Sequence, residues 1–188
     1  MTSAARRLAP LVLLLVACAA PPERPAEYLD QTTGATVRSV EVPLVFARTR
    51  LELAYGARDY VTLAAASVDR SGHIEQVLVG YVWSTIDPRM RHDVEPADQT
   101  LAIAADDRVI VLSADRRTSH DVGIAAPVAV PPGSNATQSL YPVDMATLRF
   151  LASARQLRLT IRNGTDPRPF ELWGDGRHAL LQFLSARE

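Results

Sequence analysis

The chain has 188 residues, with 20 basic and 21 acidic side chains, a single cysteine and a net charge of −1. The basic residues are all arginines, spread between acidic residues along the whole chain. This excludes the basic patch that nucleic-acid binding requires. The length suits one domain with its own hydrophobic core.

The first 17 residues have the organisation of a secretory signal peptide. Arg6 and Arg7 precede an apolar run over residues 8–17. That run is too short to span a membrane, which takes about 20 apolar residues, and it fits the apolar region of a signal peptide.

The apolar run ends at the chain's cysteine. This segment resembles the lipobox of bacterial lipoproteins: Leu15, Val16, Ala17 and Cys18. The resemblance implies that residues 1–17 are removed and that Cys18 becomes a diacylated N-terminus. Ala19 stands where an Asp retains some lipoproteins in the inner membrane, which implies the inner leaflet of the outer membrane, facing the periplasm. An ordinary signal peptide with a chance cysteine is the alternative.

The residues after the leader divide into a tether and a body. Residues 18–26 combine the lipidated Cys18 with a proline-rich stretch that reaches about 25 Å when extended. Two acyl chains suffice for stable attachment, so the lipid bilayer is a predicted partner through Cys18. Residues 27–188 form a single domain without cysteines, and we expect no disulfides in it.

The first part of the body contains the clearest β-structure. Residues 27–36 predict a turn or a short helix, and Pro43 breaks 36–46 into an edge strand or two short strands. Residues 59–86 then predict a hairpin around a turn at 69–72.

The second strand of this hairpin is apolar on both faces, which predicts a central strand. Val77, Val79, Tyr81 and Trp83 share one face. Gly80, on the other face, indicates a bulge or the close approach of another element. An exposed Trp83 would instead be a candidate for binding.

The rest of the chain adds a second hairpin, a long irregular segment and two helices. Residues 100–114 predict the hairpin, and 113–138 lose periodicity. Asp144 is expected to cap a helix to about Arg155. The strand at 156–164 is followed by a short strand at Phe170–Trp173 and by a helix that Asp175 caps. The predicted fold is mainly β (α+β): a small sandwich or a curved antiparallel sheet with two late helices.

The polar motifs do not predict catalysis or a cofactor. Ser119–Asp121 holds the residue types of a hydrolytic triad, but adjacent side chains do not form one, and a polar loop is favoured. Residues 91–98 read as a solvated acidic loop without the ligand spacing of a calcium or zinc site. We therefore expect no catalytic residues, no metal ligands and no cofactor.

Residues 122–134 are apolar, proline-rich and without periodicity. We favour a strap that covers the core. The alternative is a partner-binding segment, with four candidate contact residues: Val122, Ile124, Val128 and Val130.

The sequence thus predicts a lipid-anchored envelope protein without catalytic activity that binds an envelope protein, glycan or lipid, or serves as an accessory subunit. An envelope-acting hydrolase is the first alternative, so enzymatic activity stays open. An immunity-type lipoprotein that inhibits a toxin is the second.

Overall fold

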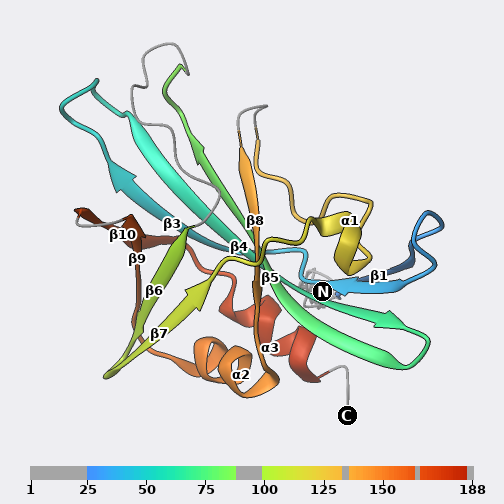
Figure 1. The fold of residues 1–188 in the computed structure, drawn as a ribbon. Helices are drawn as coiled ribbons and strands as arrows, with labels where there is room; N and C mark the ends of the chain where they lie inside the picture. Colours follow the sequence, from blue (N-terminus) through green and yellow to red (C-terminus); the bar gives the residue numbers. More distant parts are fainter. Residues whose placement is uncertain (1–24, 88–98, 133–135, 164–165, 186–188) are drawn as a thin grey trace, which may run out of the picture.

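The fold is mainly β, as predicted, and takes the form of a curved antiparallel sheet. A computed structural model describes residues 25–87, 99–132, 136–163 and 166–185, apart from the side chains of Asn163 and Asp166. In these residues ten strands form one antiparallel sheet that curls, with helices α2 and α3 at one end and α1 beside β8 (Figure 1). The predicted polar loop at 91–98 lies outside the described residues.

The elements follow in chain order. The strands are β1 (Ala26–Leu29), β2 (Thr36–Ser39), β3 (Leu44–Thr49), β4 (Arg58–Arg70), β5 (His73–Ser84), β6 (Thr100–Ala105), β7 (Arg108–Ser113), β8 (Thr137–Pro142), β9 (Leu157–Asn163) and β10 (Asp166–Gly174). The helices are α1 (Ser119–Val122), α2 (Met145–Ser153) and α3 (Arg177–Ser185).

The long β4–β5 hairpin forms the centre of the sheet and confirms the predicted unit. Its two-residue turn places Ser71 at φ 54° and Gly72 at φ 88°, the conformation of a type I′ turn, whose twist matches that of the strands. The Gly72 amide donates to Asp69 Oδ1 at 2.7 Å, so the turn residues themselves fix the register.

The break around Pro43 separates two short strands, which is one of the two predicted possibilities. Both β2 and β3 pair with the same edge of β4, at Ala66–Asp69 and at Arg58–Leu63. From there the sheet continues in two directions, to β1 beyond β2 and to β10, β9, β6 and β7 beyond β3.

The curl brings the two ends of the sheet together. β8 pairs with the free edge of β5, and the chain just after β7 meets β8 at a single bridge. There the Asp115 amide donates to the Leu140 carbonyl at 2.7 Å.

Two of the predicted elements need correction. Residues 26–29 form strand β1 rather than a helix, although the turn that follows was expected. Strand β10 starts at Asp166, not at Phe170, and contains Pro167 and Pro169. These prolines are tolerated because β3 pairs only with residues from Glu171 onward. The edge on which they lack donors has no partner strand there.

Helices α2 and α3 cover the concave side of the curled sheet. Asp144 caps α2 by accepting from the Thr147 amide at 2.6 Å, as predicted. Leu148, Leu151 and Phe183 are fully buried in the core that the helices share with the strands. The alternation predicted for β9 also holds, because Leu157, Leu159 and Ile161 are buried.

Gly80 marks a close approach, one of the two predicted possibilities. The residues of β5 from Val77 to Val82 are all buried. A Cβ atom added to Gly80 would lie 2.6 Å from Cε2 of Tyr141 on β8 and 3.4 Å from Leu63. The tyrosine ring therefore occupies the space that a side chain at position 80 would need.

We expect Gly80→Ala to cost about 1–3 kcal/mol of unfolding free energy, because the fully buried Tyr141 ring has no room to move. Urea unfolding measures this cost. Tyr141→Leu removes the clashing ring atoms, so the double variant should be more stable than the sum of the two single effects predicts. Strict additivity would contradict the proposed contact.

Candidate functional site

The segment that the sequence singled out lies across the convex face of the β4–β5 hairpin. We call its described part, residues 122–132, the strap; it leads from the end of α1 toward β8 (Figure 1). Val122, Ile124 and Val128 are buried in the core, whereas Val130 is 55% exposed. The burial agrees with the favoured interpretation as a cover, and of the four candidate contact residues it leaves only Val130 accessible.

Asp30 holds the strap through its carboxylate. Its Oδ2 accepts from the Ala125 and Ala126 amides at 2.7 and 3.1 Å. Its Oδ1 accepts from Thr32 and Thr33 in its own turn at 3.0 and 3.2 Å. Burial opposes ionisation of Asp30, but the four amides together outweigh it and hold its pKa below the usual value.

Further side chains bind the carbonyls of the strap. Thr33 Oγ1 donates to Gly123 and Tyr81 Oη donates to Val128, both at 2.8 Å. Gly123 has φ 103°, and a Cβ there would lie 2.9 Å from Val68. The irregular backbone of the strap is thus paired with side chains of β5 and of the β1–β2 connection, as a buried loop requires.

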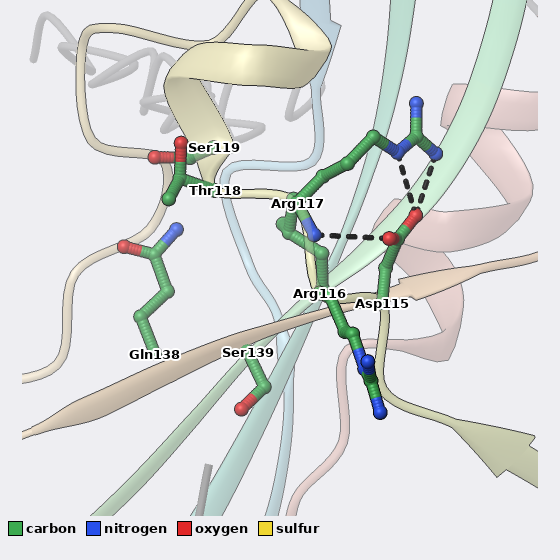
Figure 2. A pocket seen from close by; sticks show the side chains of 8 residues that line it. Asp115, Arg116, Arg117, Thr118, Ser119, Gln138 and Ser139 are labelled. Atoms are coloured by element: carbon green, nitrogen blue, oxygen red, sulfur yellow. Dashed lines mark hydrogen bonds and ion pairs between the residues drawn. The ribbon is translucent and has the colours of Figure 1, made fainter. Parts of the chain in front are cut away.

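A polar pocket of about 490 Å³ lies where α1 meets β8. Figure 2 shows Thr118, Ser119 and Gln138 on one side of it and Arg117 directed toward Asp115 on the other. Arg117 also donates to Glu75 at 3.0 Å. These two carboxylates raise the pKa of Arg117 and, in turn, Arg117 lowers the pKa of Asp115. The arginine therefore serves to join α1 to the sheet.

The triad-like residues 119–121 form the first turn of α1, and of the three only Ser119 lines the pocket. Thr118 is the N-cap, and its amide donates to Asp121 Oδ2 at 2.8 Å in a capping box. The hydrogen bonds from Thr118 lower the pKa of Asp121. Asp121 is therefore used in capping the helix, and successive helical side chains do not face one another.

A cluster of aromatic side chains lies on the convex face beyond the end of the strap. Tyr60 on β4 and Trp83 on β5 are cross-strand partners, and their rings stack at 4.2 Å. Trp173 meets Tyr60 edge to face at 6.5 Å, and the Arg58 guanidinium lies 4.5 Å above the Trp173 ring. We call Arg58, Tyr60, Trp83 and Trp173 the aromatic face.

A backbone irregularity places Trp173 there. Leu172 pairs with Phe46 and Gly174 pairs with Val45, so Trp173 is the extra residue of a bulge. Bulges redirect side chains in this way. Trp173 is 60% exposed, although large aromatic side chains gain most from burial.

A groove of about 250 Å³ adjoins the aromatic face. Its floor is formed by the sheet and its wall by the strap, with these lining residues: Glu41, Pro43, Val45, Thr62, Trp83, Ala129, Val130, Pro131 and Pro132. Trp83 Nε1 donates to Thr62 Oγ1 at 3.0 Å, so its polar atom is already satisfied. Trp173 and Val130 are exposed, Trp83 is half-buried and Tyr60 is buried beneath them. The groove and the aromatic face together therefore form a partly exposed apolar surface of the kind that binds partners.

The described histidines do not form a site with the carboxylates. His73, His120 and His178 are exposed and lie on three different elements, β5, α1 and α3. Among the residues with described positions, no three His, Cys, Asp or Glu side chains are grouped as metal ligands. In the same part of the chain, no helix has the length and apolarity to cross a membrane.

Sequence reasoning found part of this surface. It identified Trp83 as a binding candidate if exposed, and the structure leaves it half-buried beside Val130. It missed Tyr60, Arg58 and Trp173, because only the strand pairing, with β3 between β4 and β10, brings Trp173 to Tyr60 and Arg58. Cys18 and the lipobox residues Leu15–Ala17 lie outside the described residues.

The comparisons with known proteins give no relative: no protein-family model, no curated protein and no solved structure matches this chain.

Val128→Asp and Val130→Asp form a matched pair that tests the strap. At the buried position 128, an unpaired carboxylate should cost about 3 kcal/mol or more and lower the melting temperature by roughly 6–12 °C. At the exposed position 130, the same change should alter stability by only about 0.5 kcal/mol. Equal melting temperatures for the two variants would refute the assignment of Val128 to the core.

Asp30→Asn should make the free energy of unfolding less dependent on pH in the acidic range. Because the folded-state pKa of Asp30 is lowered, its carboxylate stabilises the fold above the usual Asp pKa, and this contribution disappears as the pH falls through the folded value. The variant should therefore be clearly less stable than the parent at pH 7, with a gap that narrows in strong acid. Urea unfolding across pH measures the gap. Asp107→Asn, at an exposed turn position, is the control and should show none.

Proposed function

We propose that this chain is a lipid-anchored protein of the bacterial envelope, attached through Cys18 and facing the periplasm from the inner leaflet of the outer membrane. We propose further that it acts by binding, without catalysis, through the aromatic face and the adjoining groove.

The exposure of Trp173 beside Trp83 carries the binding proposal. These are the chain's only two tryptophans, and they lie together where the strap no longer covers the sheet. A tryptophan ring that stays at the surface forgoes the stabilisation that burial would give. Tryptophan is also enriched at the centres of binding interfaces.

The scattered histidines support binding over the hydrolase alternative. A hydrolase needs a base, a nucleophile or water, and an orienting group within hydrogen-bond reach. The described histidines lie on three different elements and are not grouped with carboxylates, and Arg117 and the carboxylates it binds hold α1 in place. The toxin-inhibitor alternative stays a prediction without an observation in its favour.

Affinity capture of the full protein from its native envelope, after chemical cross-linking, tests the proposal. We expect Trp173→Ala to fold normally, because the ring is mostly exposed, and to lose the cross-linked partner. Val109→Ala, at an equally exposed position on β7, is the control and should retain it. A partner that is recovered equally with both variants would place the binding surface elsewhere.

The anchor is tested in the same preparation. Mass spectrometry should find a diacylated Cys18 at the mature N-terminus, and Cys18→Ser should abolish the acylation and release the protein from the membrane fraction. An unmodified Cys18, or a mature N-terminus at another residue, would contradict the anchor.

A further inference from the structure

The described chain enters the domain beside the groove. Ala26, the first residue of β1, pairs with Ser39 at the end of β2. Because the strands are antiparallel, Ala26 lies at the end of β2 from which the chain continues to Glu41 and Pro43. Both of these residues line the groove.

This entry point limits where the membrane can be. If Cys18 is acylated, residues 18–25 connect the bilayer to Ala26 over no more than about 25 Å. A domain of this size has a radius of gyration of about 15 Å. The face of the domain that contains Ala26 and the groove must therefore stay close to the bilayer.

The chemistry of that side fits the interfacial region of a bilayer. Tryptophan rings concentrate there because they combine an apolar body with a polar edge, and Trp173 is 60% exposed. Val130, which is 55% exposed, adds aliphatic surface at the groove. The groove lining consists mainly of proline, valine and tryptophan, whereas a sugar site would need several free donors and acceptors around its ring platform.

The charges on this side match a phospholipid headgroup. The Arg58 guanidinium lies over Trp173, and among the described residues no carboxylate is paired with it. Arginine binds phosphate well. The exposed Glu41 at the groove offers the opposite charge to the amine of a zwitterionic headgroup.

From these observations we propose that the aromatic face and the groove rest on the phospholipid surface to which Cys18 is anchored. This inference rests on the proposed function and names the partner of the same surface. The bilayer is then both the anchor's attachment site and the ligand of the domain.

The two tryptophans make the test specific, because all tryptophan fluorescence comes from this surface. The acylated protein is placed in vesicles of phosphatidylethanolamine and phosphatidylglycerol, with or without bromine on the acyl chains. Trp83→Phe leaves Trp173 as the only tryptophan, and Trp173→Phe leaves Trp83. We expect brominated lipid to remove most of the Trp173 emission and less of the Trp83 emission, and we expect Trp173 to be protected from aqueous iodide.

A pair of charge reversals serves as the control for Arg58. Arg58→Glu, made in the Trp83→Phe background, should weaken quenching by brominated lipid. Arg116→Glu, which makes the same change in charge at the polar pocket near α1, should leave quenching as it is. Equal quenching in the two variants would contradict a role for Arg58 at the lipid surface.

The outcomes separate the two proposals. A diacylated Cys18 with Trp173 open to iodide and indifferent to brominated lipid overturns the lipid contact alone. If soluble N-acetylglucosamine oligomers then shift the Trp173 emission, the surface binds a glycan instead and the proposed binding function survives. An unmodified Cys18 overturns both the anchor and the lipid contact that rests on it.

Discussion

The β4–β5 hairpin is apolar on both faces, and the rest of the fold follows from the need to cover both. A two-stranded unit cannot bury two faces by itself. The concave face is covered by the curl of the sheet and by α2 and α3. The convex face is covered by a strap without regular hydrogen bonding, so its backbone needs side-chain partners. Asp30, Thr33 and Tyr81 supply them.

The candidate binding surface lies where this cover ends. Val128 is a buried apolar side chain of the strap, and two residues further on Val130 faces outward beside Trp83. The bulge in β10 then adds Trp173 to a surface that the strap leaves open. The strap, the curl of the sheet and the helices enclose the hairpin, but they leave one aromatic, mostly apolar region that can contact something outside the domain.

Local chemistry made much of the fold predictable from sequence, and long-range pairing limited the rest. The 69–72 turn, the Asp144 cap and the alternation in β9 depend on neighbouring residues, and the structure has each of them. β10 can contain Pro167 and Pro169 because β3 pairs only with its later residues. The prolines alone therefore predicted too late a start for this strand. The role of Asp30 depends on amides about 95 residues away, and the aromatic face joins residues of three strands. Neither the contacts of Asp30 nor the aromatic face produces a periodic pattern in the sequence.

The position of Asp30 also has a practical consequence for recombinant work. The first conspicuous strand in the sequence is β2, and an expression design that began there would omit β1 and the carboxylate that receives the strap amides. Such a shortened protein would expose the convex face of the hairpin and be prone to aggregation during purification. A shortened protein for crystallisation or NMR should therefore retain β1 and Asp30.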